Sequence, residues 1–316
     1  MPDKVETDGI LVIDKPPGPT SHDLVLAARR IFRGTKIGHL GTLDPFATGV
    51  LPLCLGKATR LSQFLGRGEK IYEARILFGS ATDTGDFTGK VVFESEPPAL
   101  SEDLLRPWLE KIQTTWHQMP PRFSARKVDG VPLYVYARQG IEKEGRAREV
   151  TVSSVRLLDC GSRECRLRIH CSPGTYIRSI ADDLGASMGC GAHLLELRRL
   201  AAGEFPLSAA VDGKALLASP RREEVEPFIR PLQDLLPDFP RIVVREESIA
   251  KLKFGQTLPS ESFQDIFFPT PPASANEPSA IRLMSPSGLL LAIGTASPDD
   301  WQENQPARVH PKIVLL

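Results

Sequence analysis

Strand-like and helix-like segments follow one another in this chain without the regular alternation that a parallel βαβ sheet requires. Alternating or continuous apolar residues predict strands at residues 10–13, 70–79, 148–160 and 165–171. Apolar residues spaced three and four apart predict helices at residues 20–34, 101–113, 133–140 and 175–189. Neighbouring strands without a helix between each pair favour an α+β fold, in which flanking helices cover a mixed, mainly antiparallel sheet.

The character of the chain changes after about residue 230. The stretch FPTPPASANEPS, residues 268–279, is rich in Pro and Ser and predicts an exposed loop. Short apolar runs on both sides of it, and the closing RVHPKIVLL, predict a small and mostly β module. We therefore expect two domains, residues 1–230 and residues 231–316.

The apolar runs and the cysteines indicate the cellular compartment of the protein. No window approaches the roughly 20 apolar residues that cross a bilayer, and the N-terminus lacks a targeting pattern, so we expect a cytoplasmic protein. The five cysteines form no CxxC pair, which argues against a disulfide framework and against a zinc site. Buried, reduced thiols are the expected state.

The charges are unevenly distributed although the formal net charge is zero. Residues 23–70 hold eight basic side chains and three acidic ones, whereas residues 233–305 hold five basic and ten acidic ones. Such asymmetry lets one face attract phosphates while the whole molecule stays neutral. A solvated surface without a partner would look similar, so charge alone leaves nucleic-acid binding open.

One carboxylate stands alone in the 23-residue stretch GHLGTLDPFATGVLPLCLGKATR, residues 38–60. This residue, Asp44, lies in a Gly- and Thr-rich segment that predicts a loop, with His39 nearby and basic residues on either side. A carboxylate kept ionised by positive neighbours can act as a nucleophile or general base. The alternative is an aspartate that caps the turn before Pro45.

Three further motifs allow both a functional and a structural interpretation. In CSPGTYIRSIADDLG, a helix start and Arg178 can hold an anion, or Arg178 can pair with Asp182 one turn on. Tyr72 is either a core residue or a stacking platform for a base. Arg198 and Arg199 either contact phosphates or solvate a helix.

Motifs for several other chemistries are absent or incomplete. Asp83 and Asp86 in TDTGD lack the ligand count of a calcium loop and predict a polar loop. The chain has no Walker A, GxGxxG, HExxH or GxSxG motif, so nucleotide-dependent, dinucleotide-dependent, zinc-peptidase and serine-hydrolase activities have no support. We expect no metal and no cofactor.

Together these segments resemble the TruB family of tRNA pseudouridine-55 synthases. The resemblance covers residues 9–211 and rests on GILVIDKPPGPTSHD, GHLGTLDPFATGVLPLCLGKATR, YEARILFGSATDTGDFTGKV, PPRFSARKVDGVPLYVYARQG, GTYIRSIADDLG and GAHLLELRRLAAGEF in that order. SARKVDGVPLYVYAR resembles the stand-alone bacterial enzyme, and the tail is similar to a PUA-like module. The resemblance implies an isomerase that breaks the glycosidic bond of a uridine, rotates the uracil and rejoins it through carbon 5.

The resemblance also implies roles for individual residues. Asp44 would be the catalytic residue, and Arg178 would pair with it and keep its pKa low. Tyr72 would stack on the uracil and assist the loss of the proton from carbon 5. The implied substrate-binding residues, besides Tyr72, are His39, Tyr176, Leu197 and Lys15. Two departures from the family pattern, Leu40 and Leu200, lie beside functional motifs and remove no reacting group.

The implied partner is the T-arm of tRNA, bound by a monomer without a membrane or a small-molecule cofactor. Cations in residues 29–36, with Lys57 and Arg60, would contact its phosphates. Two other functions compete with this one. A non-catalytic RNA-binding or tRNA-folding protein would not need Asp44, Tyr72 and Arg178 together. A glycoside hydrolase normally needs two carboxylates, for which Asp86 is the nearby candidate, and it would release free uracil.

Overall fold

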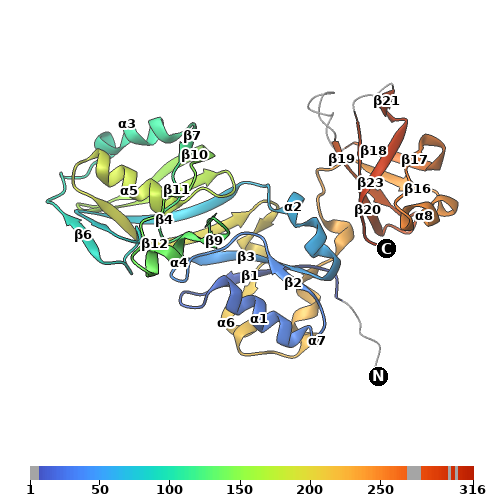
Figure 1. Ribbon diagram of the computed structural model, residues 1–316, viewed down its shortest axis with the longest axis horizontal. Helices are drawn as coiled ribbons and strands as arrows, with labels where there is room; N and C mark the ends of the chain where they lie inside the picture. The colour runs from blue at the N-terminus through green and yellow to red at the C-terminus, as the bar shows by residue number, and fades with distance from the viewer. Residues whose placement is uncertain (1–6, 269–278, 298–299, 303–304) are drawn as a thin grey trace.

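The computed structural model describes residues 7–268, 279–297, 300–302 and 305–316. Within these ranges the chain forms one large sheet, one small sheet and three two-stranded sheets (Figure 1). The large sheet has eleven strands. Its main path runs in the order β14 (Val211–Asp212), β1 (Gly9–Lys15), β3 (Thr48–Leu55), β12 (Ala192–Ala202), β4 (Lys70–Phe78), β11 (Glu164–Cys171), β10 (Arg148–Cys160) and β7 (Thr115–Gln118). Beside this path lie β2 (Ile37–His39), β13 (Phe205–Pro206) and β15 (Ile229–Arg230).

The strand directions confirm the expected mixed, mainly antiparallel sheet. In the described chain, the neighbours β1–β14 and β3–β12 of this sheet run parallel, and the other pairs are antiparallel. The strands predicted at residues 70–79, 148–160 and 165–171 are all present. The parallel contact in the middle of the sheet brings Thr48 and Gly49 beside Arg198 and Arg199, so the segment that follows Asp44 is fixed to the end of β12.

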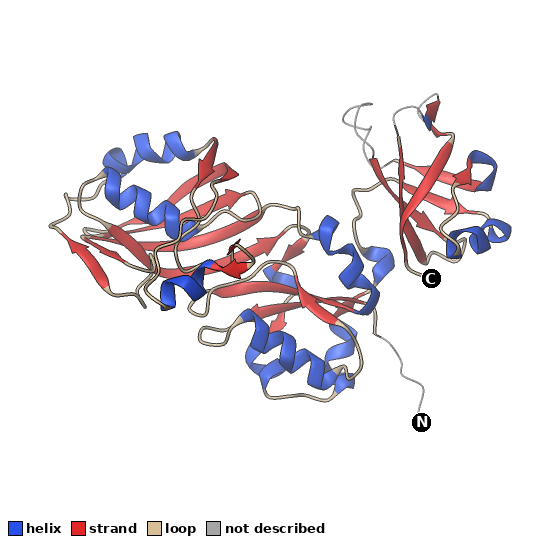
Figure 2. Cartoon of the chain, viewed as in Figure 1, coloured by secondary structure: helices blue, strands red, loops and turns tan. Residues whose placement is uncertain are grey.

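Helices flank this sheet (Figure 2). Five of them contribute buried side chains to its main core, namely α1 (Ser21–Ile31), α3 (Glu102–Ile112), α5 (Ile177–Ser187), α6 (Gly213–Leu217) and α7 (Arg222–Val225). Helix α2 (Ser62–Leu65) contributes Leu65 to a second cluster, and α4 spans Leu133–Arg138. Thr20 caps α1 in a capping box with Asp23, which explains why the helix begins at Ser21. Buried apolar residues of α1, α3, α5 and α6 share one core with the strands beneath them, and the four predicted helices are confirmed.

Two sequence interpretations are corrected by the large sheet and its edge. Arg198 and Arg199 lie on the central strand β12 and not on a helix. Two irregularities, at residues 194–196 and 199–201, shift the register of β12 and interrupt the alternation that would have revealed a strand. The second is the polar loop predicted at TDTGD, because its first residue, Thr82, ends strand β5 (Ser80–Thr82), which pairs with β6 (Val91–Glu94).

The small sheet contains the residues after Arg230 and confirms the expected β-rich module. Its strands run in the order β17 (Leu258–Pro259), β23 (Arg308–Val314), β20 (Leu290–Ala296), β19 (Ser279–Met284), β16 (Arg241–Val244) and β18 (Phe263–Phe267), with helix α8 (Glu246–Lys253) beside them. The Pro-rich loop predicted at residues 268–279 falls almost wholly outside the described residues. The domain boundary at residue 230 stays a prediction.

The two sheets share a hydrophobic core. Ile10 and Val12 of β1 point away from α1, and their cluster includes Met284 and Ile313 of the small sheet and Leu315, which follows it. Burial of such side chains contributes about 1.5–3 kcal/mol each, so this contact is a substantial part of the stability of both units.

The remaining sequence expectations concern thiols and membranes. All five cysteines are free, and four of them are buried, while Cys160 is half-buried. Burial raises the pKa of Cys54, Cys165 and Cys171 to about 12, so these thiols are protonated at neutral pH. In the part of the chain that the structure describes, no helix is long and apolar enough to span a bilayer.

Candidate active site

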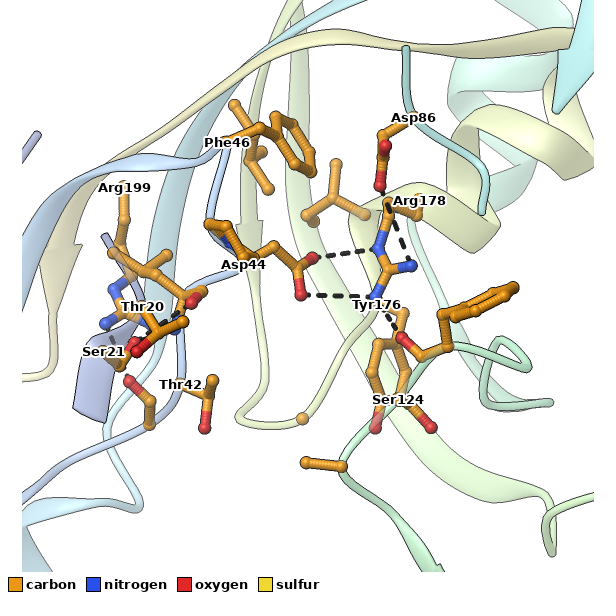
Figure 3. A pocket seen from close by; sticks show the side chains of 18 of the residues that line it. Thr20, Ser21, Thr42, Asp44, Phe46, Asp86, Ser124, Tyr176, Arg178 and Arg199 are labelled. Carbon is orange, nitrogen blue, oxygen red and sulfur yellow. Dashed lines mark hydrogen bonds and ion pairs between the residues drawn. The ribbon is translucent and has the colours of Figure 1, made fainter. Parts of the chain in front are cut away.

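A cavity of about 940 Å³ opens on the helix-covered side of the large sheet (Figure 3). Its wall combines the loop after β2, strands β4 and β12, the start of α5 and residues 123–126. Six of the seven predicted site residues line it, namely Asp44, Tyr72, Arg178, His39, Tyr176 and Leu197. The sequence therefore identified side chains that are far apart in the chain and meet in one hollow.

Asp44 lies in a tight loop that is fixed on both of its sides. The Ser21 hydroxyl, at the start of α1, accepts a hydrogen bond from the Leu43 amide at 2.9 Å and lies 3.0 Å from the Leu43 carbonyl. The Gly18 amide donates to the Pro45 carbonyl at 2.9 Å. Because the residues before and after it are held, the Asp44 backbone has little freedom to move.

Lys15 is the one residue of the predicted set that does not line the cavity, and it holds this loop instead. Its side chain is fully buried. The ammonium donates to the carbonyls of Pro45 at 2.9 Å and Ala47 at 2.7 Å, on the C-terminal side of Asp44. A third hydrogen bond, at 3.0 Å, goes to the Pro16 carbonyl. An ammonium has three donors, so none remains for a substrate.

Arg178 forms a two-point ion pair with Asp44 (Figure 3). Its Nε lies 2.9 Å from Asp44 Oδ2, and its Nη2 lies 3.3 Å from Oδ1. The same guanidinium donates to the Thr84 carbonyl at 2.7 Å and to the Phe123 carbonyl at 2.8 Å. The alternative partner Asp182 is not used. The guanidinium is thus held from three directions, and it orients the carboxylate toward the open cavity.

The direction of the Asp44 pKa differs from the expectation. Burial raises the pKa of the Asp44 carboxyl above its usual range, and the nearby Asp86 acts in the same direction. Arg178, and more weakly Lys15, lower this pKa but do not outweigh the loss of solvation. The side chain keeps about a third of its surface exposed, toward the cavity. Asp44 is therefore a poorly solvated carboxylate, which favours reactivity.

The other predicted side chains surround Asp44 with aromatic and apolar surface. Tyr72 on β4 and Leu197 on β12 are both nearly buried. Tyr72 belongs to the core and also lines the cavity, and its role as a stacking platform stays a prediction. Tyr176 is fixed by Gln118, which accepts from its amide at 2.8 Å and donates to its carbonyl at 3.1 Å. His39 has a buried Nδ1 without a partner, and burial lowers its pKa, so the ring is neutral at pH 7.

Several polar residues have structural partners that the sequence did not reveal. Asp86 is buried and accepts hydrogen bonds from the Thr88 amide and the Thr84 hydroxyl, both at 3.0 Å. It also lies 3.9 Å from Arg178. Arg198 pairs with Asp14 at 2.7 Å. No spacing rule indicates the Arg178–Asp86 and Arg198–Asp14 pairs, because each joins distant segments.

The basic residues expected on RNA phosphates are only partly free. Arg29 donates to the Ile37 carbonyl at 2.9 Å, and Lys57 lies 3.9 Å from Asp8. Arg60 donates to the Val314 carbonyl in the small sheet. Arg199 is buried to 1% exposure and cannot contact a phosphate, which corrects that interpretation.

The two departures from the family pattern lie in different surroundings. Leu40 is buried, lines the cavity and joins the core shared with the small sheet. Leu200 is half-buried at the second irregularity of β12 and does not line the cavity. Of the two, Leu40 is therefore the one that touches the site.

Comparison with known proteins gives matches over the whole chain. The model of the TruB family pseudouridylate synthase N-terminal domain matches residues 29–177, and that of the tRNA pseudouridylate synthase B C-terminal domain matches residues 178–237. The chain is 42% identical over 308 residues to tRNA pseudouridine synthase B of Solibacter usitatus, covering 98% of this chain and 100% of the relative. It is 46% identical over 251 residues to the protein of that name from Aromatoleum aromaticum, covering 79% and 81%.

A solved structure extends the match to the fold. A chain in the crystal structure of a Cbf5-Nop10-Gar1 complex superimposes with a TM-score of 0.73 at 26% identity, covering 98% of this chain and 85% of that one. The sheet, the cavity with its Asp44–Arg178 pair and these relatives define a pseudouridine synthase, an isomerase that converts uridine into pseudouridine. Within that class, the chain belongs to the TruB family.

Proposed function

We propose that this enzyme converts the uridine at position 55, in the T-loop of tRNA, into pseudouridine, with Asp44 as the nucleophile. The observation that carries the proposal is the Asp44–Arg178 pair, which presents one carboxylate to a cavity of about 940 Å³. The names of the relatives, tRNA pseudouridine synthase B, support tRNA as the substrate.

The reaction needs one nucleophile and no net oxidation or reduction. The Asp44 carboxylate attacks C1′ of the ribose, and the bond from C1′ to N1 breaks, with its electron pair leaving on the uracil. The uracil rotates, carbon 5 bonds to C1′, and the bond to Asp44 breaks. Carbon 5 then loses its proton, and N1 gains one. Substrate and product have the same atoms, so the balance requires neither a redox partner nor a nucleotide.

Arg178 orients the nucleophile. Its hydrogen bonds to the Thr84 and Phe123 carbonyls keep the guanidinium in place when Asp44 bonds to the ribose and loses its charge. A carboxylate held in one orientation avoids the entropy loss of finding C1′ by chance. Arg178 therefore acts on the geometry of attack as well as on the pKa of Asp44.

The aromatic and apolar wall receives the extruded base. Tyr72 stacks on the uracil, while Leu197 and Tyr176 bound the space in which the base turns. His39, whose neutral ring faces the cavity, contacts the RNA where the base leaves its stack. Extrusion of a base from a folded loop costs a few kcal/mol, which stacking and the exclusion of water offset.

The RNA approaches the open side of this cavity. Arg126 and Arg138 line the cavity and are exposed, so they can contact backbone phosphates without losing an existing buried partner. We propose that one protein molecule binds the T-arm as a monomer, and that the enzyme works in the cytoplasm, where tRNA is processed.

The test is to map pseudouridine along an unmodified tRNA transcript after incubation with the protein. We expect modification of the T-loop uridine by the parent and none by Asp44→Asn, which keeps the size of the side chain. Asp182→Asn is the matched control, because Asp182 is an exposed aspartate on α5 that does not line the cavity. Activity of Asp44→Asn equal to that of the control would refute the proposal.

The same experiment separates the competing functions. A hydrolase would release free uracil, whereas an isomerase retains the base. Asp86, the second carboxylate such a hydrolase would need, is buried and hydrogen-bonded within its own loop, which disfavours that chemistry. Salt-sensitive tRNA binding by the parent without any product would indicate an RNA-binding or RNA-folding role instead.

A further inference from the structure

Arg199 is the largest of the fully buried side chains in the described residues, and the proposed chemistry assigns it no task. It lies on β12 directly opposite Tyr72 on β4, so both side chains project to the same face of the sheet. Both residues line the cavity. The guanidinium therefore lies in the wall of the cavity, beside the aromatic ring expected to meet the uracil.

Backbone carbonyls fix the orientation of this guanidinium. Its Nε donates to the Val50 carbonyl at 2.6 Å, and its Nη2 donates to the Gly41 carbonyl at 3.0 Å. In the described part of the chain, no carboxylate lies within 4.0 Å of it to form a salt bridge. The positive charge is thus buried and held in place without a negative partner. Burial of an unpaired charge costs folding free energy, which indicates that this charge has a function.

Other ionisable groups around the cavity respond to this charge. Arg199 contributes to lowering the pKa of Lys15, His39 and Lys70, in each case after the larger effect of burial. Three groups on separate segments of the chain therefore experience the same positive field. An anion formed next to Arg199 would be stabilised by the same charge.

The Tyr72 hydroxyl is the group in this field that can become an anion. Arg199 from β12, Cys171 from the end of β11 and Asp44 from its loop are the charged or titratable groups that act on it. Burial raises the pKa of Tyr72, and Cys171 and Asp44 act in the same direction. Among these neighbours, only Arg199 lowers it.

We propose that Arg199 is a positioning residue that stabilises negative charge on the Tyr72 hydroxyl, so that this oxygen can accept the proton from carbon 5 of the rotated uracil. The inference rests on the proposed function. In this step the C5–H bond breaks, and its electron pair closes the C5–C6 double bond of pseudouridine. The Tyr72 hydroxyl first gives its own proton to water, and the resulting phenolate takes the proton from carbon 5, which restores the hydroxyl. N1 takes a proton from water.

The first test observes Tyr72 in the free protein, without RNA or turnover. The chain has four tyrosines, so labelling their Cζ carbons with ¹³C gives four NMR signals, and Tyr72→Phe identifies the one from Tyr72. We expect Arg199→Gln, which keeps a donor and loses the charge, to raise the Tyr72 titration midpoint by at least one pH unit. That shift is a tenfold smaller phenolate fraction at a given pH. An unchanged midpoint overturns the proposal.

Arg199→Lys keeps the test decisive if Arg199→Gln does not fold. It retains the positive charge, so we expect its Tyr72 midpoint to stay within half a unit of the parent value. A shift as large as that expected for Arg199→Gln would mean that charge is not the cause, and it would overturn the proposal. Thermal unfolding of each variant verifies that the signals come from folded protein.

The second test follows the proton itself, as release of tritium from carbon 5 of the target uridine across a pH series. For Arg199→Gln we expect about tenfold slower release at neutral pH and a smaller deficit as the pH rises. Arg198→Met is the matched control, since Arg198 is the half-exposed neighbour that pairs with Asp14. A deficit that is constant with pH overturns the proposal.

The two proposals fail in different ways. A parent protein that makes no pseudouridine on tRNA refutes the proposed function, whatever the NMR titration shows. An active parent whose Tyr72 midpoint does not respond to Arg199→Gln refutes the role of Arg199 alone.

Discussion

Replacement of Lys15 by Met removes the ammonium that donates hydrogen bonds to the loop of Asp44. The carbonyl oxygens of Pro16 and Ala47 lose their donor, whereas that of Pro45 keeps the Gly18 amide. Each buried acceptor left without a partner costs about 1–3 kcal/mol, or about 4 kcal/mol for two. Burial lowers the pKa of Lys15 from 10.5 to about 8, so the variant recovers about 3 kcal/mol of lost solvation. The expected net loss in the free energy of unfolding is about 1 kcal/mol.

Denaturant unfolding measures this loss at pH 7, with Lys57→Met as the control. Lys57 is a partly exposed lysine whose ion pair with Asp8 spans 3.9 Å, so we expect a change below about 1 kcal/mol there. The stability difference between the parent and Lys15→Met should also widen from pH 8 to pH 10.5. The folded pKa lies below the unfolded one, so unfolded parent binds more protons in that window and its stability rises with pH.

Turnover decides between a loop-holding and a substrate-binding Lys15. If Lys15 only positions Asp44, kcat falls by about tenfold or more while KM for tRNA stays close to the parent value. A Lys15→Met protein as stable as the parent, with a raised KM and an unchanged kcat, would refute the reasoning. It would also return Lys15 to the substrate-binding set.

Three further predictions follow from the same contacts. Arg178→Met removes the main group that lowers the Asp44 pKa, so the acidic limb of the pH–rate profile should move to higher pH, which single-turnover rates from pH 5 to 8 measure. Asp44→Asn should abolish pseudouridine formation and change the free energy of unfolding by no more than about 1 kcal/mol, because loss of the ion pair is offset by loss of a poorly solvated charge. A large drop in the thermal unfolding temperature of Asp44→Asn would contradict this expectation. Gly49→Ala should destabilise by at least about 2 kcal/mol, since its φ is +100° and a Cβ there would lie 2.1 Å from the Arg199 carbonyl oxygen. Gly38→Ala, with nothing within 4 Å, is the control in the same unfolding assay.

The sequence was sufficient to predict those elements and site residues that a local pattern or an isolated charge indicates. Helix α1 follows from its Thr20 cap and apolar spacing, and Asp44 stands out because its surroundings have no other acid. Arg199 was misread as a residue in contact with solvent or phosphate, because the irregularities of β12 hide the alternation that would have placed it inside. The partners of Lys15 lie 30 and 32 positions away and are carbonyls, which no side-chain motif encodes.

The pKa of Asp44 shows a second kind of limit. A neighbouring arginine can be anticipated from sequence, and it does act in the expected direction. The amount of water removed from the carboxylate depends on how segments from β2, β4 and α5 close around it. This loss of solvation changes the Asp44 pKa more than Arg178 does. The direction of the pKa shift therefore follows only from the three-dimensional packing.

The apolar cluster between the two sheets has a consequence for how the chain can be divided. Ile10 and Val12 belong to the strand that also borders β3, and the same cluster contains Ile313 from strand β23 of the small sheet and the following Leu315. A polypeptide cut after Arg230 would leave that side of β1 bare to water and prone to aggregation. Strands β1 and β23 thus belong to one cooperative unit. Truncation, proteolysis or domain exchange at the segment after Arg230 would therefore destabilise the large sheet as well.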